Sequence, residues 1–524
     1  MTVESLLLVM ANPFGEFAIT LWLLNGGIIL KWMIMGLVAA LVLIGLGFGL
    51  TGGNGRDHIS HSPEAVRLCE EGTEDLNAFR WKSAVDKLGQ SLELDPTLAE
   101  AAISRAFAFS RLGEKNEAKA EIALADSLTL AIENDQRRML AQLRLSGWGN
   151  SHFYGMRDSL LARLVTEVPD NIHVLEAQAG NAMRSEDPGE VEKAWLRVLE
   201  VDPNYASSYN NLGYLELNRG NYEKAIEYMR KYAFLAPDLA NPHDSLGEVL
   251  MVLGRYEEAE AEFRTSIKMQ PDFYHSLINL GKTYISRGQL KTGLDILEKV
   301  RSQVASSEIE KKVDYDIVST YLIAGLKEEL GRMTAIYIER YPDDDMAAVY
   351  RGMTLAYSGK VEEGRTVLDS CLTVWRKGKD YEHYPKAKRG IDSAAFQFTA
   401  LLADVEEDYE LAAENWGKAV AVTAESLSFH DQWYHRFRWA SSLHASDRSK
   451  EALAIIDPVL QVNPRNINTL VLKVECHLAL QQGEQARQAL EQLQWSLSKS
   501  DQDFPPRLRS EELALQVSAL AVGG

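Results

Sequence analysis

The sequence predicts an all-α protein, a solenoid of helix–turn–helix repeats with an N-terminal transmembrane helix. Two observations carry this prediction. Small residues and prolines recur every 34 residues in the middle of the chain, and an uncharged apolar run stands near its start. The composition agrees, because 46% of the 524 residues are hydrophobic and only 15 are proline. A chain of this composition folds and tolerates long helices.

The apolar run Trp32–Leu50 is expected to cross a membrane. It carries no charged residue, and at about 1.5 Å rise per residue it spans roughly 28 Å, close to the hydrocarbon thickness of a bilayer. Lys31 and Trp32 stand at one end, where a cation and an aromatic ring suit the interface. The preceding residues 1–30 contain no Lys or Arg. A cleaved signal peptide is therefore disfavoured, and we expect the anchor to remain.

The flanks of this segment leave two questions open. Within the N-terminal tail, residues 1–31, the apolar stretch Phe17–Leu30 is either an interfacial helix or a second span, and we favour a single crossing. Residues 51–63 form a linker. The positively charged residues on the two sides of the apolar run nearly balance. The orientation in the membrane is therefore only weakly determined, and we slightly favour a repeat domain outside the cytoplasm.

Charge and motifs exclude several classes of function. The formal net charge of −20 opposes nucleic-acid binding, which needs a basic surface. There is no GxxxxGK[ST] loop, no GxGxxG after a strand, no GxSxG and no HExxH, so we expect no enzyme activity, no cofactor and no small-molecule substrate. Cys69, Cys371 and Cys476 lack the spacing of a zinc site. They are expected to be buried residues on helices, and we predict no metal site.

Four positions recur in one 34-residue frame. They are a small residue, a glycine seven residues later, a second small residue, and a proline. In order, the members are Gly213, Gly247 and Gly281; Gly220, Gly254 and Gly288; Ala225, Ala259 and Gly293; and Pro203, Pro237 and Pro271. The first small residue lets helix A approach helix B, and the glycine after it ends helix A by accepting a positive φ. The proline ends helix B. Helix A is therefore expected to begin at Ala206, Ala240 and Tyr274.

These residues resemble the tetratricopeptide repeat family. The resemblance is clear over residues 204–303, and it implies a right-handed superhelical solenoid with a concave groove lined by the A helices. Partial matches extend it to residues 64–203 and 304–500. Further repeats are expected to begin at Ala65, Ala99, Asp345, Trp433 and Ile467. Residues 501–524 are expected to hold a capping helix that starts at Ser510, since a solenoid must cover its open end.

The resemblance also implies where a partner would bind. The A helices of such repeats typically hold an extended peptide or a helix in the groove. The matching positions here are Asn210, Asn211, Tyr214, Asn218, Asn241, Asp244, Ser245, Glu248, Asn279 and Lys282. An asparagine side chain can both donate to and accept from a peptide backbone. The alternative is that these are ordinary surface residues.

One basic stretch stands out against the acidic background. It is expected to be an insertion between repeats, over residues 376–392, and either a solvated loop or a docking loop for an acidic partner or a lipid head group. Its basic residues are Arg376, Lys377, Lys379, Lys386, Lys388 and Arg389.

Taken together, the anchor and the resemblance indicate a non-catalytic, membrane-anchored protein-binding scaffold. It would recruit or assemble partner proteins at a membrane through its groove, with membrane lipid and other proteins as its partners. The alternative is an accessory or regulatory subunit of a membrane enzyme, export or motor complex. Such a subunit would contact its complex through residues 17–50, and the apolar stretch Phe17–Leu30 favours this reading of the N-terminus.

Removal of residues 1–50 should leave a soluble and strongly helical protein, because amphipathic repeats replace the apolar run after Leu50. Circular dichroism and size-exclusion chromatography of the truncated chain test this expectation. Aggregation, or a spectrum dominated by strand, would show that the repeat boundaries are wrong.

Overall fold

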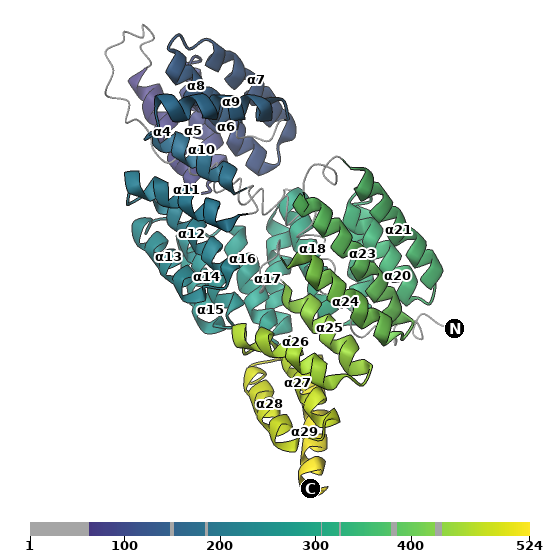
Figure 1. Cartoon of the computed structure of the whole chain (residues 1–524). Helices are drawn as coiled ribbons and strands as arrows, with labels where there is room; N and C mark the ends of the chain where they lie inside the picture. Colours follow the sequence, from purple (N-terminus) through teal and green to yellow (C-terminus); the bar gives the residue numbers. More distant parts are fainter. Residues whose placement is uncertain are drawn as a thin grey trace. The chain divides into compact units, whose positions relative to one another are not determined.

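The computed structural model describes residues 62–146, 151–183, 187–304, 307–323, 326–378, 385–424 and 432–523. These residues contain twenty-five α-helices and no strand (Figure 1). They divide into two compact units. One holds residues 62–215 and 227–242, and the other holds residues 216–226 and 243–523. The predicted all-α helical repeat array is therefore confirmed for the described part of the chain.

The helices follow one another with short connections. Up to residue 303 they are α4 (Pro63–Asn77), α5 (Trp81–Leu94), α6 (Ala99–Leu112), α7 (Lys115–Leu130), α8 (Asp135–Ser146), α9 (Ser151–Glu167), α10 (Ile172–Ala182), α11 (Pro188–Val201), α12 (Ala206–Arg219), α13 (Tyr222–Leu235), α14 (Ala240–Val252), α15 (Tyr256–Met269), α16 (Tyr274–Ser286) and α17 (Leu290–Gln303). The later ones are α18 (Ser307–Ile323), α19 (Lys327–Arg340), α20 (Asp345–Tyr357), α21 (Val361–Lys377), α23 (Pro385–Val405), α24 (Tyr409–Thr423), α25 (Trp433–Ala445), α26 (Ser449–Val462), α27 (Ile467–Ala479), α28 (Gly483–Ser496) and α29 (Pro505–Gly523).

Consecutive helices form twelve pairs, from α4–α5 to α27–α28, and α29 follows alone. The first helix of each pair is called helix A below and the second helix B. The predicted starts of helix A are confirmed at Ala206, Ala240 and Tyr274 in the clear repeats. The starts are also confirmed for four partial repeats, at Ala99, Asp345, Trp433 and Ile467. Helix α4 begins at Pro63, two residues before the expected Ala65.

The small residue of the repeat lies where the two helices of a pair cross. A Cβ atom added to Gly247 would stand 2.5 Å from Phe263 of the paired helix. At Gly213 it would stand 2.8 Å from Met229. Real Cβ atoms essentially never come this close to a neighbour, so a larger residue would force the facing side chain to move, most of all the rigid ring of Phe263. The side chain of helix B then fills the space, and Phe263 is completely buried.

The second glycine holds the turn between the helices. Gly220, Gly254 and Gly288 have φ values of +81°, +70° and +75°, in the left-handed region that glycine adopts without steric cost. Phe79 and Gln481 occupy the same turn position with φ values of 62° and 56° although they carry side chains. The turn geometry is thus kept even in repeats that lack the glycine.

Apolar clusters run along each unit. In the unit of residues 62–215, Leu88 and Phe107 belong to one buried cluster and Trp195 to another. In the unit of residues 243–523, the largest cluster extends from Ile278 to Leu402. Each pair thus buries its apolar face against its neighbours, as in a repeat array.

The predictions for the two ends of the chain have different outcomes. Helix α29 begins at Pro505, five residues earlier than the predicted start at Ser510, because proline is tolerated in the first turn of a helix. Its Leu513 and Val517 pack on α27 and α28. The predicted transmembrane helix at residues 32–50 lies outside the described residues. None of the helices within them is both long and apolar enough to cross a membrane.

Replacing Gly247 with leucine should lower the free energy of unfolding by roughly 1–3 kcal/mol or more, because the new side chain overlaps Phe263. Gly331 is a matched control, since it also lies inside a helix but has no atom within 4 Å of an added Cβ. Gly331→Leu should be neutral, or stabilising by up to about 1 kcal/mol through helix propensity. Urea unfolding of both variants measures the difference. Equal effects would contradict the close crossing at Gly247.

Candidate partner-binding surfaces

The predicted groove residues of α14 and α16 form a hydrogen-bonded bridge between the two A helices. The Oγ of Ser276 donates to Oδ1 of Asp244 at 2.7 Å. The Nδ2 of Asn279 lies 3.3 Å from the same oxygen and 3.0 Å from Oε1 of Glu248. Asp244 and Asn279 are each only 6% exposed. The bridge therefore fixes how one repeat stacks on the next. The side-chain amide of Asn279, which was expected to face a partner, donates its hydrogen bonds within the bridge instead.

The bridge has an unusual protonation state. Burial, and secondly the nearby carboxylate of Glu248, raise the pKa of Asp244 to about 8, while the hydrogen bonds from Ser276 and Asn279 act against this shift. A raised pKa favours the protonated, uncharged form of Asp244, in which the bridge buries less charge.

A second polar bridge continues from α16 to α18. The Nζ of Lys282 lies 3.6 Å from Asp316, and the Nζ of Lys312 lies 3.3 Å from the same carboxylate. Burial alone would raise the pKa of Asp316, but the two lysines outweigh burial and hold this pKa below its usual value. Lys282 keeps 38% of its side chain exposed. This lysine is thus anchored by an acid and still reachable from solvent.

The predicted residues of α12 are arranged differently. Asn210 is 2% exposed, and its Oδ1 has no hydrogen-bond partner among the described residues. Asn211 donates to the Ser207 carbonyl of its own helix at 2.8 Å. Tyr214 is half-buried and Asn218 is exposed. Asn218 is therefore the predicted residue of this helix most open to a partner.

Two predicted residues of α14 remain. Asn241 donates to the Tyr232 hydroxyl at 3.1 Å, and Ser245 is buried. Half of the ten predicted residues are thus less than a tenth exposed, namely Asn210, Asn211, Asp244, Ser245 and Asn279. For Asp244 and Asn279 the burial comes from the bridge between two A helices. A partner-binding role for the ten residues stays a prediction. Ser276, Lys312 and Asp316 complete the bridges and were not anticipated.

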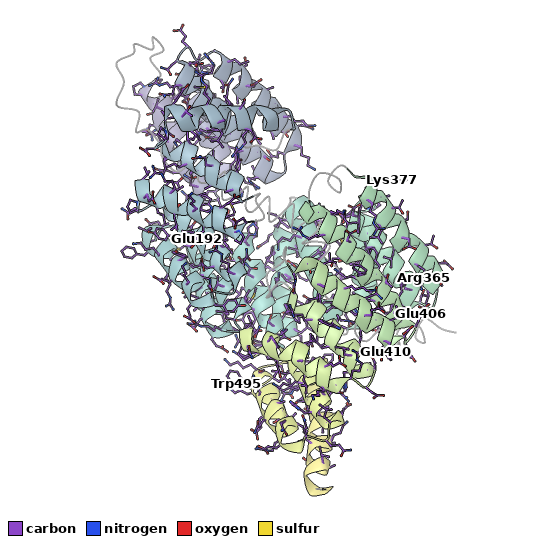
Figure 2. The ribbon with its side chains drawn as sticks, in the orientation of Figure 1. Glu192, Arg365, Lys377, Glu406, Glu410 and Trp495 are labelled. Carbon is purple, nitrogen blue, oxygen red and sulfur yellow. The ribbon has the colours of Figure 1, made fainter. Side chains whose placement is uncertain are left out.

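Of the predicted basic insertion, residues 376–392, the structure describes the two ends, and residues 379–384 lie outside the described residues. Arg376 and Lys377 belong to the last turn of α21, and Lys388 and Arg389 lie in the first turns of α23 (Figure 2 labels Lys377). The guanidinium of Arg376 lies 3.8 Å from Asp392 of α23. Lys379 and the side chain of Lys386 lie outside the described residues. The basic residues are therefore carried mainly by two helix ends, with residues 378–384 between them.

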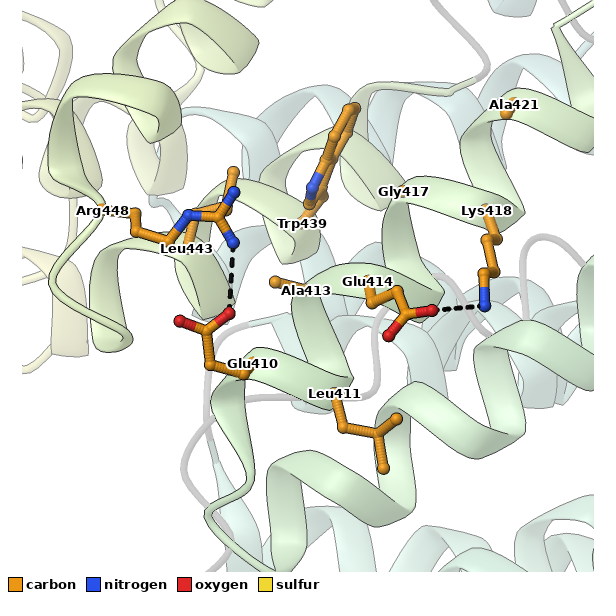
Figure 3. Close-up of a pocket in the computed structure, with 10 residues that line it drawn as sticks. All are labelled: Glu410, Leu411, Ala413, Glu414, Gly417, Lys418, Ala421, Trp439, Leu443 and Arg448. Carbon is orange, nitrogen blue, oxygen red and sulfur yellow. Dashed lines mark hydrogen bonds and ion pairs between the residues drawn. The ribbon is translucent and has the colours of Figure 1, made fainter.

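Residues of α24 and α25 line most of an open pocket of about 670 Å³ (Figure 3). The Trp439 indole lies directly on the backbone of Gly417, where an added Cβ would stand 3.1 Å from it. Figure 3 shows this ring between two ion pairs, Arg448–Glu410 at 3.2 Å and Lys418–Glu414 at 2.6 Å. No sequence pattern had indicated this pocket.

Within the described ranges, no three His, Cys, Asp or Glu side chains are grouped so that they could hold a metal ion. Cys69, Cys371 and Cys476 are buried and unpaired, as predicted. Burial raises the pKa of the Cys371 thiol to about 11, so it is not a reactive thiolate at neutral pH.

Comparison with known families agrees with the repeat geometry. Three family models, each described as tetratricopeptide repeat, match residues 194–227, 245–307 and 443–494. The chain therefore contains tetratricopeptide repeats, and none of these three models describes an enzyme. Over the described residues the fold is an all-α helical repeat array. No curated protein matches the chain.

Several solved structures are similar to the chain at low identity. The Cut9–Hcn1 hetero-tetramer of APC/C is 13% identical, covers 86% of this chain and 83% of its own, and has a TM-score of 0.38. Yeast Tom70 is 11% identical, with coverage of 88% and 96% and a TM-score of 0.31. A tetratricopeptide repeat protein from Parabacteroides merdae is 14% identical, with coverage of 60% and 98% and a TM-score of 0.26. Similarity at these TM-scores carries no information about partners.

The protonation of Asp244 predicts a distinctive dependence of stability on pH. An acid whose pKa is raised on folding binds its proton more tightly in the folded state. Its contribution to stability is therefore lost as pH rises from the unfolded pKa near 4 towards about 8. Asp244→Asn, which cannot ionise, should gain stability relative to the parent chain over this range and level off above it.

Asp316→Asn serves as the opposite control, because the pKa of Asp316 is lowered on folding. Its ionised form stabilises the folded chain above pH 4, and the variant should be less stable than the parent at neutral pH. Urea unfolding midpoints between pH 5 and pH 9 measure both effects. A pH-independent difference between Asp244→Asn and the parent would show that Asp244 is ionised in the folded chain.

Proposed function

We propose that this protein is a non-catalytic scaffold, anchored at a membrane by residues 32–50, that recruits or assembles partner proteins on its A helices. The observation that carries the proposal is the polar bridge system of α14, α16 and α18. Buried hydrogen bonds fix the backbone there, while Glu248 and Lys282 remain partly exposed. A binding face that is rigid before its partner arrives loses less entropy on binding.

The face of α14 and α16 suits a partner of mixed charge. The carboxylate of Glu248 and the ammonium of Lys282 lie on successive A helices. The neutral Asn279 holds Glu248 in place, and the carboxylate of Asp316 holds Lys282. An extended peptide or a helix with complementary charges could pair with both groups. Such pairs contribute specificity and association rate more than affinity.

Support for the membrane anchor comes from the sequence alone. The stretch Trp32–Leu50 carries no charge and has the length of a bilayer span. A scaffold tied to a membrane would concentrate its partners at that surface. The apolar stretch Phe17–Leu30 supports the second candidate, an accessory subunit that contacts a membrane complex through residues 17–50.

The proposal is tested with the full-length chain purified from its native membranes together with bound proteins. Lys282→Glu should reduce recovery of the specific partner at least about tenfold, which is roughly 1.4 kcal/mol. The control is Lys268→Glu, which makes the same change of charge on an exposed position of helix B.

Full recovery by Lys282→Glu would exclude this face as the site. Recovery that disappears when residues 1–50 are removed, but not with Lys282→Glu, would favour the accessory-subunit alternative.

A further inference from the structure

Residues 463–504 contact two turns that lie more than 200 positions earlier in the chain. The Nδ2 of Asn463 donates to the Tyr256 hydroxyl at 3.1 Å, across 207 positions. The guanidinium of Arg465 lies 2.6 Å from the Glu257 carboxylate, across 208 positions. Tyr256 and Glu257 are the first residues of α15, directly after the turn at Gly254. All of these residues belong to the same compact unit.

Aromatic rings strengthen this first contact. The Arg465 guanidinium lies 5.0 Å from the centroid of the Tyr256 ring and 4.7 Å from that of Trp495. Trp495, labelled in Figure 2 on α28, is 60% exposed. Lys499 adds a second cation 3.6 Å from Glu257. Cation–π attraction and ion pairing thus act together on one arginine.

The second contact is made at the turn between α16 and α17. The backbone N–H of Asp501 donates to the Gly288 carbonyl at 3.0 Å. The Asp501 carboxylate in turn accepts from the backbone N–H of Lys291 at 2.9 Å, across 210 positions. Lys291 stands in the first turn of α17. Asp501 therefore satisfies a helix N-terminus that a capping residue next to the helix would ordinarily satisfy.

The turn glycines at these two places have a second role. An added Cβ at Gly288 would stand 2.6 Å from Cβ of Ser500 and 2.8 Å from Phe504. At Gly254 it would overlap the Asn463 side chain. At the equivalent Gly359, which has the same left-handed backbone, nothing lies within 4 Å. The turns at Gly254 and Gly288 are therefore shaped to receive another segment.

An apolar patch joins the same two parts of the chain, and Ile285 and Leu294 pack against it from α16 and α17. Leu290 of α17 belongs to one buried cluster with Leu460, Ile467 and Phe504. The surrounding ion pairs are open to solvent, since Lys291 and Asp503 are paired at 3.0 Å and are 70% and 68% exposed. An apolar centre with a solvent-accessible charged rim is typical of interfaces between separately folded parts of a chain, which can move relative to each other.

We propose that residues 463–504 form a releasable latch, which closes the helix pairs from α14 to α28 into a loop by docking on the turns at Gly254 and Gly288. Helices α27, α28 and α29 pack on one another, and Leu470, Val474 and Leu493 are fully buried. The latch therefore opens as a folded body rather than by unfolding.

Opening has a consequence for the proposed binding face, and this part rests on the proposed function. The two pairs held by the latch also carry Glu248 and Lys282. A closed latch holds those pairs together, and an open latch lets them move as an ordinary open array does. The latch itself is testable without any partner.

The test is hydrogen–deuterium exchange of the full-length chain with Gly288→Ala, compared with Gly359→Ala. Both substitutions place alanine at a positive φ, +75° and +83°, so both carry similar backbone strain. Only the first displaces Ser500 and Phe504. Gly288→Ala should raise exchange at least tenfold in peptides covering residues 288–292 and 498–504. Peptides inside α27 and α28 should stay protected, and Gly359→Ala should leave all of these unchanged.

Asp501→Ala provides a second variant if Gly288→Ala does not fold. It removes the acceptor for the Lys291 N–H and keeps the backbone, so the same peptides should exchange faster. Unchanged exchange in both variants would show that the segment is not docked. Simultaneous loss of protection throughout α27 and α28 would show that the segment unfolds with its contacts and is no latch. A confirmed latch with no effect of Lys282→Glu on partner recovery would reject only the proposed binding face.

Discussion

The close crossing of two helices at a position without a side chain is the constraint on which this structure depends. Phe263 occupies the space that a side chain at Gly247 would need, and Met229 does the same at Gly213. With this contact these pairs bury their apolar sides and offer a regular surface to the next pair. The stacking of pairs, the turns between them and the exposed faces all follow from that geometry.

Buried polar groups then decide how the pairs are stacked. Asp404 of α23 accepts from Trp416 of α24 at 3.1 Å and from Ser442 of α25 at 3.0 Å, and it pairs with Arg438 of α25. The bridge around Asp244 does the same for α14 and α16. A slip of one helix along its neighbour would leave these groups buried without partners, at a cost of about 1–3 kcal/mol for each neutral group. Apolar contacts alone would tolerate such a slip more easily.

The sequence was informative wherever a residue has a local role. Helix starts at Ala206, Ala240 and Tyr274 followed from glycines and prolines that act within a single pair. The burial of Asn279 could not be predicted in this way, because it depends on Asp244 of the preceding repeat and on the angle between pairs. Turn geometry at Gln481 was also hidden, since tertiary packing holds a non-glycine residue at positive φ.

The capping of α17 by Asp501 illustrates the limit most clearly. Nothing near Lys291 in the sequence marks Asp501 as its partner, because the pair is brought together by everything between them. No fixed spacing in the sequence identifies contact pairs of this kind. They are found only when the accumulated rotation of successive pairs is known.

Because of that contact, the helix pairs from α14 to α28 are joined end to end as a closed ring. In an open solenoid a small tilt within one pair shifts only what lies beyond it, and nothing opposes the shift. Here the helices from α18 to α25 set the effective concentration of Asp501 at its acceptor on Gly288, and a tilt in any of them changes it. A substitution or a ligand far from either turn can therefore alter ring closure, so that repeats with no mutual contact become energetically coupled.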